Sequence, residues 1–385
     1  MTTSRSARKS PGFGQPLRLI VRLILIGIGL GVLSGSLLRL MAPQVRQQQF
    51  ALPGWLEEQP WLSELLANSP APAEPPPELT SGAALKPISL ARFNPRLPIT
   101  ALSERWAALA ATQPELKASA FMHVLDTGRF ADFNGEQPMA AASSIKTPIL
   151  LTALELLDRQ ALQWNEPLTL TEELVGGGAG WMASRPLGSR FPTYEVATEM
   201  IRVSDNSATN LLIDRVGGKE AINQRFQDLG LLATEVNNWL PDLDGTNTTS
   251  ARDLSRSIAL VDSGEILSPR TRDLFREVMA TSVTNTLLPT GLMRGLGGAQ
   301  GAPDDSLARK GYRVLNKTGD IGIAYADAGL IELPDGTRAV AGFMVEGPFN
   351  DPRSTELIRT MAAAMAPYLK PQPAPPTPAT TSPAP

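Results

Sequence analysis

The chain has 385 residues, a net charge of −3 and a pI near 5.5, which allow one large domain or two small ones and give no reason to expect nucleic acid as a partner. Cysteine is absent, so disulfides, thiol catalysis and thiolate metal sites are excluded. His123 is the only histidine, so a multi-histidine zinc site is excluded too, and hydrolytic chemistry must find its base in lysine or carboxylate. We therefore expect no metal and no organic cofactor.

Residues 1–41 have the pattern of a membrane anchor. The stretch that ends at Arg22 is basic and has no acidic residue, and the uncharged run Leu23–Leu38 follows it and is closed by Arg39. This run is shorter than the roughly 20 residues of a full span, but arginines at both ends can snorkel to the interface. We expect an uncleaved single-pass anchor over residues 19–41 in the cytoplasmic membrane, with the rest of the chain on the outer, periplasmic side. The alternative is a cleaved signal peptide, although no A-x-A site follows the run.

Proline-rich segments flank the expected folded unit on both sides. Residues 42–100 include the run PAPAEPPPE at 70–78, a composition that favours extended conformations and predicts a semi-rigid stalk. Residues 371–385 are rich in Pro, Thr and Ala and predict a disordered tail. The folded domain is therefore expected at about residues 101–370.

Within residues 101–370, strand patterns lie near both ends and helical patterns lie between them. The first two strands, Ala120–Asp126 and Arg129–Phe133, predict a hairpin, and we expect His123 to be a packed or half-exposed residue of the first. One sheet assembled from both chain ends around a helical block predicts an α+β fold with three layers, α/β/α. Helices are expected at 101–113, 144–161, 194–203, 207–215, 218–230, 251–263, 270–279 and 354–368, and further strands at Arg313–Lys317, Ala324–Glu332 and Arg338–Glu346.

The sequence S-S-I-K at 143–146 is the first motif that suggests chemistry. If Ser143 opens a helix, Lys146 lies on the same face, beside the serine hydroxyl. The residues that follow are apolar nearly all round, so this helix is expected to be buried, where a charged lysine is costly unless it is paired or neutral. A lysine with a lowered pKa could take the proton of Ser143. The alternative is an N-cap serine followed by a solvated lysine, because the S-x-x-K pattern alone is common.

Two further motifs follow along the chain. The sequence S-D-N at 204–206 lies between two helical segments, where all three residue types also serve as helix N-caps. The sequence K-T-G at 317–319 ends a strand, and an edge strand there could pair with an extended peptide while its glycine allows close approach. Each motif is weak alone, but the three in this order are specific.

The three motifs together resemble the signature of the class A β-lactamase and penicillin-binding protein superfamily. The resemblance covers essentially all of residues 101–370. Ser204–Gly218 is similar to the family's stretch through its second motif, and Thr318–Glu332 is similar to its closing strands. The resemblance implies a serine hydrolase of the class A fold, with an antiparallel sheet from both chain ends and an all-helical subdomain.

The resemblance also implies a role for each matching catalytic residue. Ser143 would be the acylated nucleophile and Lys146 its activating base. Ser204 would pass a proton to the leaving amine, assisted by the charge of Lys317. Asn210, which follows the second motif, is expected to be structural.

Other matching residues would bind the substrate. Asn206 would hold the acyl side-chain amide, Thr318 would bind the substrate carboxylate with its hydroxyl, and Gly319 would leave room for the ligand. The backbone N–H of Asp320 would form the oxyanion hole together with that of the nucleophile.

One loop departs from the β-lactamase pattern. The W-x-P-x-L frame at 239–243 resembles the Ω-loop segment in which class A enzymes carry the glutamate that activates water for deacylation. Leu240 stands at the place of that glutamate, and Asp244 stands where asparagine is usual. Leucine cannot take a proton from water, and the loss of a positioned general base typically costs about 10²–10⁴-fold in rate. The arginine that often holds the substrate carboxylate is missing as well, with Ala326 and Asp327 in that neighbourhood.

This combination most resembles the penicillin-binding proteins of the A type, which have the class A fold and no Ω-loop glutamate. The leading hypothesis is a D-alanyl-D-alanine carboxypeptidase or endopeptidase that acts on peptidoglycan stem peptides. β-Lactam antibiotics would acylate this enzyme, and the acyl group would be released slowly. One rival is a β-lactamase that recruits Asp242 or Asp244 as its base, although both are more readily explained as loop caps. The other rival is a non-catalytic cell-wall-binding module.

Overall fold

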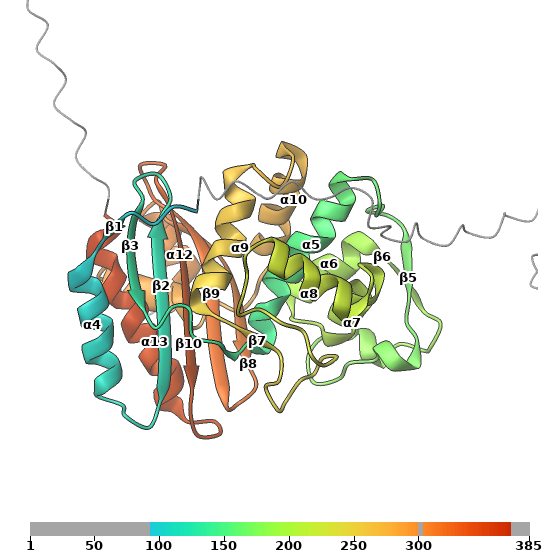
Figure 1. Cartoon of the computed structure of the whole chain (residues 1–385), viewed down its shortest axis with the longest axis horizontal. Helices are drawn as coiled ribbons and strands as arrows, with labels where there is room; N and C mark the ends of the chain where they lie inside the picture. Colours follow the sequence, from blue (N-terminus) through green and yellow to red (C-terminus); the bar gives the residue numbers. More distant parts are fainter. Residues whose placement is uncertain (1–92, 299–302, 371–385) are drawn as a thin grey trace, which may run out of the picture. The chain divides into compact units, whose positions relative to one another are not determined.

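The computed structural model describes residues 93–298 and 303–370 (Figure 1). The predicted anchor, most of the predicted stalk and the predicted tail lie outside these ranges. None of the helices within them is long and apolar enough to cross a bilayer. The membrane anchor therefore stays a prediction.

A six-stranded sheet forms the middle layer of the fold (Figure 1). In order across the sheet, its strands are β1 (Leu97–Pro98), β3 (Arg129–Phe133), β2 (Lys117–Val124), β10 (Arg338–Glu346), β9 (Ala324–Glu332) and β8 (Arg313–Asp320). Neighbouring strands are antiparallel, except that β1 is parallel to β3. The sheet is thus built from both ends of the described chain, and β8 is an edge strand.

Helices from near the two ends of the described chain form the first outer layer. They are α4 (Thr100–Ala111), α11 (Leu288–Gly295), α12 (Pro303–Arg309), α13 (Pro352–Met365) and the short helix η4 (Ala366–Tyr368). Helix α13 packs against both α4 and β10, and Figure 1 shows α4 and α13 together on one side of the sheet. The indole of Trp106 on α4 is fully buried and donates a hydrogen bond to the carbonyl of Met361 on α13 (2.8 Å).

The remaining helices form the second outer layer and the helical subdomain. They are α5 (Lys146–Asp158), α6 (Thr193–Arg202), α7 (Asn206–Arg215), α8 (Gly218–Asp228), α9 (Ala251–Ser263) and α10 (Pro269–Ala280). Helix α9 lies against β2 and β10, and α5 contacts every other helix of this set. This central position explains why the α5 sequence is apolar on all sides.

Short elements connect these layers. They are η1 (Ala142–Ile145), η2 (Glu172–Leu174), η3 (Met182–Ser184), the pair β4 (Met139–Ala140) and β7 (Thr248–Thr249), and the pair β5 (Pro167–Thr169) and β6 (Arg190–Pro192). The turn η1 follows β4 and leads directly into α5.

The predicted α+β fold with three layers is confirmed, but two helices were not predicted. Helices α11 and α12 are short, and α11 contains Gly291 and Gly295, which lower helix propensity. Both glycines face α13 closely: a Cβ on Gly291 would lie 2.5 Å from the Arg359 carbonyl oxygen, and one on Gly295 2.2 Å from that of Ala363. The residues that weaken the helical pattern are therefore the ones that the packing requires.

The boundary of the folded unit also differs from the expected start at residue 101. Phe93 and Ile99 are buried, and β1 pairs with β3, so residues 93–100 of the predicted stalk belong to the domain. Proline made this segment look like a linker. Pro98 is tolerated because β1 lies at the edge of the sheet, where a strand can lack an N–H donor.

Candidate active site

Ser143 and Lys146 lie where η1 passes into α5. Ala142, just before the serine, has a positive φ of 46°, an uncommon backbone conformation for a residue with a Cβ. The turn and the helix place Lys146 Nζ 2.9 Å from Ser143 Oγ. The lysine side chain is fully buried, and the serine is partly exposed.

Lys146 Nζ also contacts the S-D-N motif. It lies 2.7 Å from the Ser204 carbonyl oxygen, 3.0 Å from Ser204 Oγ and 2.8 Å from Asn206 Oδ1. The carbonyl and amide oxygens can only accept hydrogen bonds, so they use two N–H groups of the amine. A neutral amine then has its lone pair free to accept a proton from a hydroxyl.

Electrostatics favour this neutral form of Lys146. Burial lowers the pKa of Lys146 well below its ordinary value, the charge of Lys317 lowers it further, and Asp205 opposes both effects. The arrangement suits a lysine that takes the proton of Ser143.

Asp205, in the middle of the S-D-N motif, holds this part of the cleft together. One carboxylate oxygen accepts the N–H of Ala208 and caps α7, and the other accepts the N–H groups of Trp181 and Met182. The preceding residue, Ser204, has a positive φ of 62°. Asp205 thus fixes the backbone that presents the Ser204 hydroxyl to Lys146.

The K-T-G motif lies on β8, which continues to Asp320 and is longer than predicted. Lys317 is fully buried and donates a hydrogen bond to the Thr318 carbonyl (2.6 Å). Burial lowers the pKa of Lys317 to about 8, although the charge of Asp327 raises it. Lys317 therefore keeps its proton up to a pH of about 8. The positive charge of Lys317 in turn lowers the pKa of Lys146.

Gly319 brings β8 against the nucleophile turn. A Cβ at this position would lie 2.8 Å from the Ser144 nitrogen and 2.9 Å from the Ser143 nitrogen. Both contacts are shorter than real Cβ contacts, so glycine is needed for the strand to pass this close to the backbone N–H of Ser143. Asp320 comes next along the strand, which suits its backbone N–H as the second donor of an oxyanion hole.

A cleft of about 120 Å³ opens between these elements. Its lining comes from the nucleophile turn, the glycine-rich loop before η3, the end of β8 and the loop at 240–243. The lining residues are Ala142, Ser143, Gly178, Ala179, Asn206, Leu240, Pro241, Asp242, Leu243, Asp320 and Ile321.

Leu240 is held at the wall of this cleft by Asn210. The Asn210 amide accepts the Leu240 N–H (2.9 Å) and donates to the Leu240 carbonyl (2.8 Å). Asn210 has the structural contacts that we expected. The leucine side chain is buried and apolar, so it brings no base to the cleft.

The two aspartates of this loop were the alternative bases. Asp242 lines the cleft, but its carboxylate accepts hydrogen bonds from the Thr246 hydroxyl (2.9 Å) and the Asn247 N–H (2.6 Å), as a loop cap does. Asp244 is exposed and is not among the residues that line the cleft.

Two features of the site were not predicted from the sequence. One is the role of Asp205, and the other is the loop at 176–180, where a Cβ on Gly180 would overlap Asp205 and one on Gly176 would overlap the Leu240 carbonyl. The Asn206 amide donates to the carbonyl of Gly177 in the same loop (2.8 Å). The run of glycines at 176–178 was the available signal.

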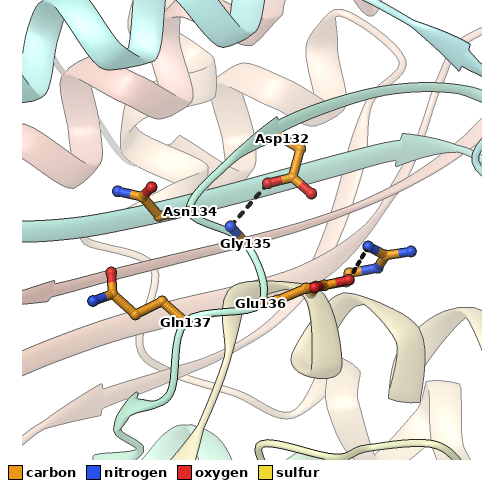
Figure 2. A pocket seen from close by; sticks show the side chains of 6 residues that line it. Asp132, Asn134, Gly135, Glu136 and Gln137 are labelled. Atoms are coloured by element: carbon orange, nitrogen blue, oxygen red, sulfur yellow. Dashed lines mark hydrogen bonds and ion pairs between the residues drawn. The ribbon is translucent and has the colours of Figure 1, made fainter.

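A second hollow, of about 490 Å³, lies where β3 leads toward β4 and is separate from the cleft (Figure 2). Its polar side chains are partly paired: Asp132 accepts the Gly135 N–H, and Arg252 pairs with Glu136. The described residues that line it include no serine, threonine or lysine.

His123 is not among the residues that line the cleft. His123 is buried on β2 with its ring edge-on to Phe93 (5.3 Å between centroids), and burial lowers its pKa to about 4. Within residues 93–298 and 303–370, no three His, Asp or Glu side chains cluster in a way that could hold a metal ion.

Comparison with known proteins identifies the family of this domain. A model of the family described as "Beta-lactamase enzyme family" matches residues 101–369. The chain is similar to the β-lactamase of Streptomyces albus G, at 26% identity over 170 residues that make up 41% of this chain and 54% of that protein. The matched part thus spans about half the length of that relative.

Among solved structures, the chain is similar to PBP-A. The identity is 42% with a TM-score of 0.65, and the match covers 71% of this chain and 97% of PBP-A. A leucine-to-glutamate mutant of PBP-A, described as an acyl-enzyme complex with penicillin G, is 41% identical with the same TM-score and covers 71% of this chain and 98% of that one. Because the family model matches nearly the whole folded domain, the chain belongs to the Beta-lactamase enzyme family, among the serine hydrolases related to class A β-lactamases and penicillin-binding proteins.

Proposed function

We propose that this protein is a penicillin-binding D-alanyl-D-alanine peptidase that acts on peptidoglycan stem peptides through an acyl-Ser143 intermediate. The observation that carries the proposal is that the apolar residue Leu240 lines the cleft. The acylation groups surround Ser143, while an apolar side chain occupies the wall where a deacylation base would be needed.

Acylation begins when neutral Lys146 accepts the proton of Ser143. The serine oxygen attacks the carbonyl carbon of the terminal D-Ala–D-Ala bond, and the backbone N–H groups of Ser143 and Asp320 stabilise the negative charge on the carbonyl oxygen. Ser204 then donates its proton to the leaving amine and regains one from Lys146. The C–N bond breaks, and free D-alanine departs.

The rate of deacylation distinguishes a penicillin-binding protein, which stays acylated by the antibiotic, from a β-lactamase, which releases the hydrolysed antibiotic quickly. Water must attack the acyl ester, and the loss of a positioned base costs about 10²–10⁴-fold in rate. Leu240 offers no such base, and Asp242 is engaged in capping its loop. We therefore expect a penicilloyl ester on Ser143 to be released slowly. A mutant of PBP-A, similar over 98% of its length, is described as an acyl-enzyme complex with penicillin G, which supports acylation of Ser143 by penicillin.

The proposal includes a location. The apolar run at 23–38 would anchor the chain in the cytoplasmic membrane, and the proline-rich residues before 93 would act as a spacer to the peptidoglycan on the outer side.

The test is to incubate the full-length protein with a labelled penicillin and follow the adduct by mass. A long-lived adduct on Ser143 is the expected result. Ser143→Ala should abolish the adduct, whereas Ser144→Ala, which changes a neighbouring buried serine that bonds only to the Ala141 carbonyl, should keep it.

The rival functions predict other results in the same experiment. Rapid turnover without an accumulated adduct would mean a β-lactamase, which is the name that the curated relatives carry. No adduct and no turnover would mean a non-catalytic wall-binding module.

A further inference from the structure

Four apolar side chains form a ledge at the rim of the cleft. Leu243 and Ile321 line the cleft itself, and Ile323 and Phe349 lie next to them. Three of the four are exposed: 66% of Leu243, 37% of Ile323 and 71% of Phe349 is accessible to solvent. Single exposed apolar residues are common on soluble domains, but a contiguous group of them indicates a binding surface. We call these four residues the rim ledge.

Two glycines connect the members of the rim ledge. A Cβ on Gly245 would lie 3.3 Å from Ile321 Cδ1 and 3.8 Å from Ile323 Cδ1, so both isoleucines lie against the loop that also forms the cleft wall. A Cβ on Gly322 would lie 2.4 Å from the ring of Phe349, so this ring covers the turn between the two isoleucines. The rim ledge is therefore one continuous surface.

Hydrogen bonds hold the rim ledge in place. The Asp320 carboxylate accepts the Gly322 N–H (2.8 Å) and closes the turn after β8. The loop after β10 is bonded to the same turn, because the Asn350 N–H donates to the Gly322 carbonyl (2.9 Å) and the Gly347 N–H donates to the Ile323 carbonyl (3.0 Å). The loop thus presents its aromatic ring without a cost for ordering when a ligand binds.

The position of the rim ledge assigns it to the acyl part of a donor. The described residues that line the cleft include Ser143 and Asn206 but not Ser204, which serves the leaving amine. Asn206 is the residue expected to hold the acyl amide. A group beyond that amide continues along the cleft wall toward Leu243 and Ile321.

We propose that the rim ledge selects acyl donors that carry a long apolar chain or an aromatic ring on the acyl side over donors that carry a short chain there. The inference rests on the proposed function, because it names the donors that the same site prefers. In a stem peptide, the group that reaches the ledge is the side chain of the residue before the terminal D-Ala–D-Ala. The methylene groups of a long side chain would be buried against Leu243 and Ile321, and Phe349 would cover the far end.

The test compares two penicillins that share the same nucleus and carboxylate and differ only in the acyl side chain, which is phenylacetyl in one and acetyl in the other. The measured quantity is the ratio of their second-order rate constants for acylation of Ser143 in the full-length protein. We expect the phenylacetyl compound to react roughly tenfold faster, because a ring on the ledge is buried on one face only. Phe349→Ala should lower this ratio roughly threefold. Tyr194→Ala, which removes an exposed aromatic ring outside the cleft, should leave the ratio unchanged.

Two further variants separate recognition from a structural role. Phe349→Leu keeps an apolar side chain over the turn and should restore most of the preference. Leu243→Ser, on the other loop, should lower the ratio as well. A general distortion of the site would slow both penicillins and leave their ratio unchanged.

Several results would contradict the proposal. A ratio near one in the wild type overturns it, and so does a ratio that neither Phe349→Ala nor Leu243→Ser lowers. Self-association that Phe349→Ala abolishes without moving the ratio would assign the rim ledge to a second copy of the chain and overturn the proposal too.

The outcomes also separate this inference from the proposed function. Adducts on Ser143 that form at the same rate with both penicillins would overturn the inference alone. No adduct with either penicillin would overturn both. A preference for the phenylacetyl compound without release of D-alanine from any D-Ala-D-Ala peptide would overturn the proposed peptidase and support the selection by the rim ledge.

Discussion

Lys146 and Lys317 are two buried amines in one cleft, and their surroundings give them different charges. Burial lowers the pKa of both, but the charge of Lys317 acts on Lys146, while the charge of Asp327 raises the pKa of Lys317. As the pH rises, Lys146 therefore loses its proton first. The cleft can hold a neutral base and a charged lysine at the same pH.

The pH dependence of the acylation rate should reflect the titration of both lysines. The rate of Ser143 acylation by penicillin should rise with pH as Lys146 loses its proton, and fall above a pH of about 8 as Lys317 loses its charge. Lys317→Arg should move the falling limb to a much higher pH, because a guanidinium stays protonated. The measurement is the rate of adduct formation by rapid quench. A falling limb that stays near pH 8 in the arginine variant would assign it to another group.

Leu240→Glu should speed deacylation. The new carboxylate would lie at the cleft wall, where it could take a proton from the attacking water, and we expect the release rate to rise on the order of 10²-fold, the lower end of what a general base provides. The measurement is the lifetime of the penicilloyl adduct by mass. Leu232→Glu, at an exposed position outside the cleft, is the matched control. An unchanged lifetime in Leu240→Glu would show that the side chain does not reach the water.

At the scale of elements, the site depends on how closely an edge strand approaches a turn. Strand β8 and turn η1 belong to segments that are far apart in the sequence, and they meet at Gly319. Two residues of the site have positive φ: Ala142, just before the nucleophile, and Ser204, which contacts Lys146. Strained backbone of this kind persists only where surrounding structure holds it, and here α5, α7 and β8 do so.

Gly319→Ala should reduce acylation far more than stability. The added Cβ would push β8 away from the Ser143 N–H, and the loss of one oxyanion donor typically costs about 10²–10³-fold. Gly342→Ala is the matched control, because a Cβ there would lie 2.5 Å from the Ala251 carbonyl oxygen, within the same sheet but outside the cleft. The measurements are the acylation rate and urea unfolding of both variants. Equal losses of acylation in the two would contradict the specific role of Gly319.

At the scale of the whole molecule, the sheet joins segments from both ends of the described chain. The β2–β10 pairing connects residues near 120 with residues near 340, and the helical subdomain lies between them in sequence. The segment before α4 extends this arrangement. Phe93 packs against Phe121 (5.7 Å between ring centroids), and the Ile99 N–H donates to the Phe130 carbonyl (2.6 Å).

Truncation should show that residues 93–100 stabilise the domain. A chain that starts at residue 93 should unfold like the full chain, whereas one that starts at residue 101 should lose about 4 kcal/mol, because burial of Phe93 and Ile99 contributes roughly 1.5–3 kcal/mol each. The measurement is the free energy of unfolding in urea. Equal stability of the two truncated chains would mean that the packing of this segment on the sheet does not contribute to the free energy of unfolding.

Most of the fold could be predicted because its long elements carry clear periodicity. The strands at 324–332 and 338–346 match the expected bounds, and helix α5 was recognisable from its apolar sequence. Two of the elements that were missed, α11 and β1, contain glycine or proline, whose presence is explained only by a neighbouring helix or a sheet edge. Local pattern cannot report a requirement that a distant segment imposes.

The sequence by itself determined the family and the candidate catalytic residues, since S-x-x-K, S-D-N and K-T-G name side chains whose chemistry is local. It also placed Leu240 where a base would be expected. Only the tertiary structure decided that Lys146 is surrounded by acceptors that suit a neutral amine, that Asp205 holds the second motif and that Asp327 is buried behind Thr318. The physical reason is that pKa and hydrogen-bond direction depend on burial and on partners far away in the chain, which the folded structure alone brings within contact distance.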